Sequence, residues 1–219
     1  MIFFITLIYA SLGMSSLPQG FVSLNDICPQ MKFVMSYATP DNFTGVVVDG
    51  YKAQKAFMAE PAAQALCRVQ IKAQAQGLTL KIFDSYRPVK AVTFFQKWAQ
   101  MPETNPKIKE IYYPGFSRLQ LFEQDYIAKQ SSHSRGSAVD LTLAEIKTGK
   151  SLDMGSGFDF FDDLSHTDSQ KINAEQRKNR MLLKSLMEGE GFKNFSQEWW
   201  HYSFRPEPFP DQYFDFDVI

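Results

Sequence analysis

Two short stretches of the sequence carry side chains that could bind a metal. The stretch SSHSRGSAVDLTL, residues 131–143, places His133 seven residues before Asp140. A second stretch, EWWH, places Glu198 three residues before His201. Imidazole and carboxylate are standard zinc ligands, and a catalytic zinc site typically has three protein ligands and one open position. His133, Asp140 and His201 therefore form a candidate ligand set.

The ligand types alone leave the metal and the chemistry open. Two imidazoles and one carboxylate suit Zn²⁺, but the same set also occurs in non-haem Fe(II) oxygenases. Glu198 favours a hydrolase, because a carboxylate near a ligand can take a proton from the attacking water and pass it to a leaving amine. The third histidine of the chain, His166, lies among polar residues in a loop-like segment and is not expected to be a ligand. On spacing alone, histidines with purely structural roles are the alternative.

The pattern of apolar residues predicts the elements that must position these side chains. Helices are predicted over 61–77, 88–100 and 170–190, and strands over 78–84, 138–143 and 199–204. The segment 101–130 contains prolines at 102, 106 and 114 and predicts a long excursion with at most a short helix near 119–129. The predicted fold class is α+β, a single domain whose antiparallel sheet is flanked by helices. The candidate ligands lie at strand ends.

Length and composition limit the classes of function. The chain has 219 residues, of which 44% are apolar and 15% aromatic, enough for the core of one domain over 21–219. Its 23 Lys and Arg residues balance 24 Asp and Glu residues, so there is no long-range positive field. Nucleic acid is therefore not an expected partner. The expected partner is a small or neutral molecule.

The N-terminal segment predicts export. Residues 2–12 are nearly all apolar, which is the length of a signal-peptide core and too short to span a bilayer. Residues 1–20 are thus a predicted signal peptide, and the mature domain is expected to be periplasmic or secreted without lasting membrane insertion. No Lys or Arg precedes Lys32, so a core element and a cytoplasmic protein remain the alternatives. Cys28 and Cys67 could pair in an oxidising compartment, or Cys67 could be a buried free thiol.

The motifs resemble those of a known family, the VanX-type D-alanyl-D-alanine dipeptidases. SSHSRGSAVDLTL matches the family signature S-x-H-x-x-G-x-A-x-D, and EWWH matches E-x-x-H. The stretches DSYRP, YATPDNFTG and VVVDGY strengthen the resemblance, which runs in the family's order from about Tyr37 to His201. It implies a zinc peptidase fold shared with D,D-carboxypeptidases and the hedgehog signalling domain.

The resemblance also implies roles for the candidate residues. It implies one Zn²⁺ per chain, held by His133, Asp140 and His201. It assigns Glu198 as the general base and Arg87 as a residue that stabilises the transition state. A guanidinium suits that role, because it stays charged and can stabilise the negative charge that develops on a carbonyl oxygen.

Four further residues match positions that contact substrate in the family: Ser131, Asp159, Tyr37 and Tyr51. The resemblance places Asp159 against the ammonium group of the substrate. Capping or core packing remains the alternative role for Ser131 and the two tyrosines.

The expected function is zinc-dependent hydrolysis of the dipeptide D-alanyl-D-alanine to two D-alanines. One alternative is a D,D- or L,D-carboxypeptidase that acts on longer peptidoglycan peptides, which Asp159 opposes because it calls for a free amine nearby. The other alternative is a non-catalytic zinc-containing binding module, which Glu198 and Arg87 oppose. The sequence carries no signal for the oligomeric state.

Overall fold

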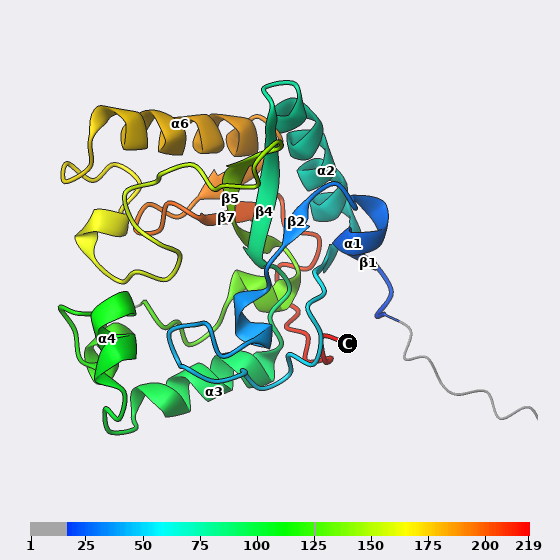
Figure 1. Cartoon of the computed structure of the whole chain (residues 1–219). Helices are drawn as coiled ribbons and strands as arrows, with labels where there is room; N and C mark the ends of the chain where they lie inside the picture. The colour runs from blue at the N-terminus through cyan, green and yellow to red at the C-terminus, as the bar shows by residue number, and fades with distance from the viewer. Residues whose placement is uncertain (1–16, 125) are drawn as a thin grey trace, which may run out of the picture.

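A five-stranded sheet with the strand order β2-β4-β5-β7-β6 organises the fold (Figure 1). The computed structural model describes residues 17–124 and 126–219, so most of the expected signal peptide lies outside the described residues. The strands of this sheet are β2 (Lys32–Phe33), β4 (Leu78–Asp84), β5 (Ala138–Glu145), β6 (Phe192–Asn194) and β7 (His201–Phe204). Neighbours pair antiparallel except for the edge strand β2, which runs parallel to β4. A separate antiparallel pair is formed by β1 (Phe21–Ser23) and β3 (Phe57–Ala59).

The two longest helices pack on the sheet, and two shorter ones lie beyond its strand ends. In Figure 1, α2 (Glu60–Gln74) and α6 (Ala174–Glu188) lie at the top, next to the strands. Lower in the same view are α3 (Val89–Ala99) and α4 (Pro106–Tyr112). The remaining helices are α1 (Leu24–Ile27) and α5 (Arg118–Glu123). The mixed α+β architecture confirms the predicted fold class.

Local sequence signals explain where the long helices begin. α2 has a proline in its first turn, where the missing N–H has no helical partner to lose. α6 begins with a capping box, in which Asn173 and Gln176 bond each other's backbone N–H groups. Such a cap is worth about 1 kcal/mol to a helix. The three predicted helices are confirmed, each with ends shifted by a few residues.

The segment 101–130 contains the short helix expected near 119–129, but the limit to one helix was wrong, because a second helix precedes it. Asn105 caps α4, which then begins with Pro106, and Ser117 with Gln120 forms the capping box of α5. α4 is only seven residues long and has no buried residue, so its apolar positions Ile108, Ile111 and Tyr112 give only a short helical pattern. The clearer signals for this helix in the sequence are the cap residue Asn105 and Pro106.

The core consists of two clusters of different composition. The first is mainly aliphatic and lies between the sheet, α2 and α6. The second is mainly aromatic and includes Tyr37, Phe43, Phe95 and Trp98 near α3. Pairs of these rings meet edge to face, as between Phe43 and Trp98 with centroids 5.1 Å apart. The strand ends that carry the candidate ligands lie between the two clusters.

One covalent link joins the N-terminal part to the long helix. Cys28 directly follows α1 and forms a disulfide with Cys67 in α2. Of the two possibilities that the sequence left open, the structure therefore contains the bridge.

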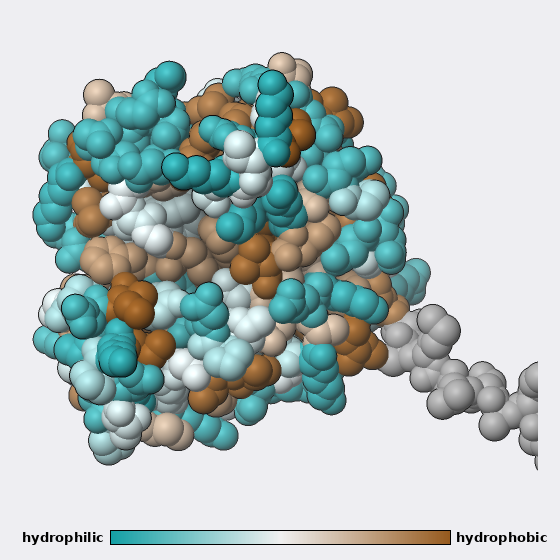
Figure 2. All heavy atoms as spheres, viewed as in Figure 1, coloured by the Kyte–Doolittle hydropathy of each residue, from teal (hydrophilic) through white to brown (hydrophobic). Residues whose placement is uncertain are grey.

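Within 17–124 and 126–219, no helix is long and apolar enough to cross a bilayer. Figure 2 shows polar side chains over much of α6, with apolar side chains in a band between α6 and α4.

The last fifteen residues, 205–219, run back along the loops that surround the strand ends. Phe214 donates its N–H to Ser134 O at 2.8 Å and accepts from Val89 N at 3.1 Å. Further along, Val218 bonds Gly50 O through its N–H at 2.8 Å and pairs in a bridge with Tyr51. This C-terminal segment thus joins three loops that are distant in sequence.

Candidate active site

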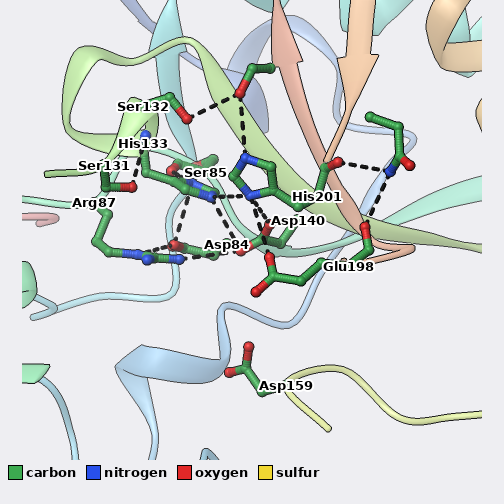
Figure 3. A network of polar contacts seen from close by, with 12 residues as sticks. Asp84, Ser85, Arg87, Ser131, Ser132, His133, Asp140, Asp159, Glu198 and His201 are labelled. Atoms are coloured by element: carbon green, nitrogen blue, oxygen red, sulfur yellow. Dashed lines mark hydrogen bonds and ion pairs between the residues drawn. The ribbon is translucent and has the colours of Figure 1, made fainter. Parts of the chain in front are cut away.

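Strand register brings three of the polar residues into one row across the sheet. Asp84 in β4 is opposite Asp140 in β5, and Asp140 is opposite His201 in β7. All three side chains face one side of the sheet, where Figure 3 shows them converging. Antiparallel pairing fixes such neighbours at about 4.5–5.5 Å between Cα atoms, close enough for direct contact.

A β-bulge is what turns Asp84 toward this row. In β4, Ile82 belongs to the aliphatic core and pairs with Leu141. Strict alternation would turn Asp84 to the same core face as Ile82. Instead, the register shifts between them, and the extra residue places Asp84 opposite Asp140.

His133 is placed by the 3₁₀ helix Ser132–Arg135 just before β5. Its backbone N–H is capped by Ser131 Oγ at 3.2 Å, and its Nδ1 lies 2.6 Å from Ser85 O. A backbone carbonyl can only accept, so Nδ1 carries the proton and Nε2 has a free lone pair. Gly136 ends the turn at φ 71°, where a Cβ would lie 2.6 Å from the Phe21 ring. Only glycine fits there.

The three candidate ligands converge on one point. His133 Nε2 lies 3.2 Å from His201 Nδ1 and 3.3 Å from Asp140 Oδ2, and Asp140 Oδ1 lies 3.0 Å from His201 Nδ1. In the described part of the chain, these residues form a group whose donor atoms all lie within 4.8 Å of one another. Two imidazole nitrogens and a carboxylate oxygen fit a divalent metal such as zinc.

The surroundings of the donors favour the protonation states that bind a metal. Burial acts to raise the pKa of Asp140, but the neighbouring His133 and His201 lower it well below its ordinary value. Burial lowers the pKa of His201. The carboxylate and the neutral imidazole are the forms that bind a metal.

Ser203 lies behind His201 on the same strand. Its Oγ is 3.3 Å from His201 Nε2 and 3.0 Å from Ser132 Oγ. A hydroxyl that accepts from Nε2–H keeps the other ring nitrogen, Nδ1, free for a metal.

Glu198 lies in the turn between β6 and β7, with Oε2 3.9 Å from His201 Nδ1. The predicted strand 199–204 is shorter than expected, because β7 begins only at His201 and the two tryptophans before it are buried in the turn. Burial raises the pKa of Glu198 well above its usual range, and the negative charges of Asp140 and Asp159 raise it further. A carboxylate with a raised pKa is a more effective base near neutral pH.

Arg87 joins the two aspartates of the row. Its Nε donates to Asp84 Oδ2 at 2.8 Å, and its Nη2 donates to Asp140 Oδ2 at 3.2 Å. The guanidinium also lies over the rings of Tyr37 and Phe95, at 5.1 and 5.4 Å from their centroids. Burial acts to lower the pKa of Arg87, but Asp84 and its neighbours raise it above its ordinary value, so the cation is kept.

Asp159 faces the donors from another loop, as Figure 3 shows. It is 4% exposed, has φ 57°, and accepts a hydrogen bond from Tyr37 Oη at 2.8 Å. Burial raises its pKa well above the ordinary value, and the charge of Asp140 raises it further. An ammonium group placed there would relieve both effects.

These side chains line one cavity of about 200 Å³. Its wall includes eight of the nine predicted site residues, namely Tyr37, Arg87, Ser131, His133, Asp140, Asp159, Glu198 and His201. Tyr51 is not part of the wall. Its hydroxyl donates to Asp84 Oδ1 at 2.6 Å, so Tyr51 holds the partner of Arg87 rather than facing the cavity. His166 lies outside the donor group, near Tyr126.

Sequence reasoning missed residues that support the site from behind. Asp84 is fully buried at the end of an apolar strand and lies three residues before Arg87, which was a usable signal for an ion pair. Ser85 contributes only its backbone carbonyl, which no sequence pattern reports. Ser203 has no signal apart from its place two residues after His201.

Comparisons with known proteins identify the family to which the chain is similar. The family described as D-ala-D-ala dipeptidase matches residues 18–219. A D-alanyl-D-alanine dipeptidase of Enterococcus faecium is 45% identical over 199 residues, covering 91% of this chain and 98% of that protein. One of Streptomyces coelicolor is 40% identical over 198 residues, covering 90% and 98%.

A solved structure is also similar. It is a crystal structure of a mutant of the vancomycin resistance D,D-pentapeptidase VanY in complex with Zn(II), with a TM-score of 0.39 and 16% identity, covering 68% of this chain and 73% of that one. The family match spans all the site residues, and the identity to the dipeptidases extends over nearly the whole chain. The chain belongs to the D-Ala-D-Ala dipeptidase family of peptidases.

Proposed function

We propose that this protein is a zinc-dependent enzyme that hydrolyses D-alanyl-D-alanine to two D-alanines. The observation that carries the proposal is a single cavity that contains a three-donor metal group, the carboxylate of Glu198, and a second carboxylate, Asp159, on its opposite side. The family match and the names of the relatives support the choice of substrate.

The residues that would hold one Zn²⁺ are His133, Asp140 and His201. Bound there, zinc supplies Lewis acidity, which polarises a peptide carbonyl and makes a water more acidic. Ser85 and Ser203 orient the two imidazoles toward this position through their other ring nitrogens.

Glu198 is the proposed general base. Its carboxylate lies at the cavity wall beside the donors, where it can take a proton from the attacking water and deliver it to the leaving amine. Proton transfer by a positioned side chain of this kind contributes roughly 10²–10⁴-fold to a rate.

Arg87 is proposed to stabilise the negative charge that develops on the carbonyl oxygen. It lines the cavity and is fixed by Asp84 and Asp140, so its position is set before substrate arrives. Preorganised positive charge in a site shielded from water is among the largest contributions to such catalysis.

Asp159 is proposed to bind the free ammonium of the dipeptide. This role favours a dipeptidase over a carboxypeptidase that acts on longer peptides, because a blocked amine would leave the buried carboxylate of Asp159 without a cation.

We further propose that the enzyme acts outside the cytoplasm. The apolar segment 2–12 supports export, and the Cys28–Cys67 bridge is of a kind that persists in oxidising compartments. Mass spectrometry of the protein from its native cells should find a mature N-terminus near residue 21. Retention of Met1 in a cytoplasmic fraction would contradict export.

The test of the enzymatic proposal is release of free D-alanine from D-Ala-D-Ala by purified protein. We expect release with zinc, loss after chelation, recovery on adding zinc back, and a loss of about 10²–10⁴-fold in Glu198→Ala. Glu145→Ala removes a carboxylate that is exposed and outside the cavity, so it should retain full activity.

Blocked substrate separates the two peptidase classes. We expect N-acetyl-D-Ala-D-Ala to be a poor substrate, and preference for it would assign the protein to the carboxypeptidases instead. Stoichiometric bound zinc without hydrolysis of either compound would favour a binding module.

A further inference from the structure

The turn between β6 and β7 carries both Glu198 and His201, and one side chain bridges its two ends. Asn194, the last residue of β6, donates through Nδ2 to Glu198 O at 3.1 Å and to His201 O at 3.0 Å. A single amide group therefore bonds the backbone of the proposed base and the backbone of a metal donor.

A buried threonine fixes the orientation of this amide. Thr167 is 1% exposed and donates through Oγ1 to Asn194 Oδ1 at 2.6 Å. Because the amide oxygen accepts from Thr167, the amide nitrogen must face the turn. Thr167 also donates its backbone N–H to Ser196 O within the same turn, at 2.9 Å.

Both carbonyls that Asn194 contacts already have another donor. His201 N–H bonds Glu198 O at 3.2 Å, and Phe195 N–H bonds His201 O at 3.0 Å. Loss of the Asn194 amide would thus leave neither carbonyl without a partner, which limits the cost in folding free energy. The contribution of the amide is mainly to the relative position of the two residues.

The two ends of the turn differ in how firmly the rest of the fold holds them. His201 is paired with Asp140 in the sheet. Glu198 lies outside the strands, and among the described residues its backbone groups bond only Phe195, His201 and Asn194. Removing the amide should therefore displace Glu198 more than His201.

We propose that Asn194 is a positioning residue that sets the place of Glu198 relative to the metal donors. This inference rests on the proposed function, because it assigns to Asn194 an effect on the base of that reaction. A misplacement of about 1 Å can lower a rate roughly 100-fold, so a modest shift of the turn has a measurable effect.

The experiment compares Asn194→Ala and Asn194→Asp with wild-type protein. Asn194→Asp keeps the acceptor for Thr167 but turns a carboxylate oxygen toward two carbonyls, so it should have the larger effect. We expect kcat for D-Ala-D-Ala to fall about 10-fold in the alanine variant and about 100-fold in the aspartate variant. KM and the zinc affinity, measured by competition with a chromophoric chelator, should change less than about 3-fold.

A matched control is Asn179→Ala, which removes another amide that bonds a single backbone carbonyl, Asp153 O at 2.9 Å, but in α6. It should lower the thermal stability while leaving kcat unchanged. Unchanged kcat in both Asn194 variants, or a fall in zinc affinity as large as the fall in kcat, would overturn the proposal.

A second measurement does not depend on activity. Amide hydrogen exchange over 195–200 should become faster in Asn194→Ala than in wild type and remain unchanged in the Asn179 control. If wild-type protein fails to hydrolyse the dipeptide, the proposed function fails, and this exchange still tests whether Asn194 holds the turn. Equal exchange in wild type and Asn194→Ala would refute the positioning role itself.

Discussion

The two sides of the cavity are built differently. On the donor side, His133, His201 and Arg87 each have a partner behind them, respectively Ser85 O, Ser203 Oγ and Asp84. On the opposite side, Asp159 accepts one hydrogen bond from a side chain of the described residues, that of Tyr37. Its backbone is also in the left-handed region. Both sides are buried, but within the part of the chain that the structure describes only the donor side has a cation, Arg87, that bonds its aspartates.

This difference separates two tasks. The donor side must hold several groups in a fixed geometry before substrate arrives, which requires supporting contacts. On the other side, the buried carboxylate of Asp159 has no ion pair within 17–124 and 126–219, and its charge is unfavourable until a cation binds. The buried charge of Asp159 is unfavourable in the free protein. Part of the binding free energy of an ammonium substrate therefore comes from compensating this charge.

Among the changes that test this comparison of the two sides, removal of Arg87 from the donor side has the largest expected effect. Arg87→Ala leaves the buried carboxylates of Asp84 and Asp140 without their shared cation. We expect kcat to fall by about 10²–10³-fold and the free energy of unfolding to fall by about 3–5 kcal/mol. Steady-state kinetics on folded protein and urea denaturation measure the two effects.

Arg118→Ala is the control for this variant. Arg118 is also buried and bonds an acidic residue, Glu103, but it lies outside the cavity. It should lower stability and leave kcat unchanged. A wild-type kcat in Arg87→Ala would show that the donor side does not need this cation.

An intermediate effect is expected at Asp159, with opposite signs for activity and stability. Asp159→Asn keeps an acceptor for Tyr37 and tolerates the left-handed backbone but removes the charge. We expect kcat/KM for D-Ala-D-Ala to fall about 10–100-fold, the value of a hydrogen bond to a charged group.

The stability effect of the same variant depends on pH. Since burial raises the folded-state pKa of Asp159, the folded protein binds its proton more tightly than the unfolded chain does. That contribution is complete below the unfolded-state pKa and is lost as the pH rises through the folded-state value. Asp159→Asn should therefore be more stable than wild type at pH 8, by about 2–4 °C in Tm, and not at pH 3. A lower Tm at pH 8 would mean that the free carboxylate already has a stabilising partner.

The smallest effect is expected at Ser203. It would show how much the contact behind His201 contributes to metal binding on the donor side. Ser203→Ala removes the hydroxyl beside His201 Nε2. Loss of such a partner typically costs about 10–100-fold in metal affinity, and we expect the lower end because the distance is long. Chelator competition measures it, and Ser132→Ala, one step further from the ring, should cost less. An unchanged affinity in Ser203→Ala would show that His201 is oriented by its strand alone.

The sequence predicted the secondary-structure elements and the polar residues of the cavity. It predicted less well the residues that hold those polar side chains in place. The strand over 78–84 has the expected bounds, and eight predicted site residues line one cavity, because apolar alternation and short motifs are local signals. The bulge in β4 is not such a signal. It depends on pairing with β5, and without it Asp84 would be read as a core-facing position. In 101–130 one short helix was expected and α4 was missed, because α4 has only seven residues and none of them is buried.

The C-terminal segment has a consequence for when the protein becomes an enzyme. Every residue that lines the cavity has been synthesised once His201 has been added, but the loops next to His133 and Arg87 are bonded by Phe214, and the loop before Tyr51 is bonded by Val218. The strands of the sheet can therefore pair before these last bonds form, and the active site is complete only afterwards. Catalysis is expected to begin only after this segment has packed against the loops. A protease that removes the segment should abolish activity before the sheet unfolds.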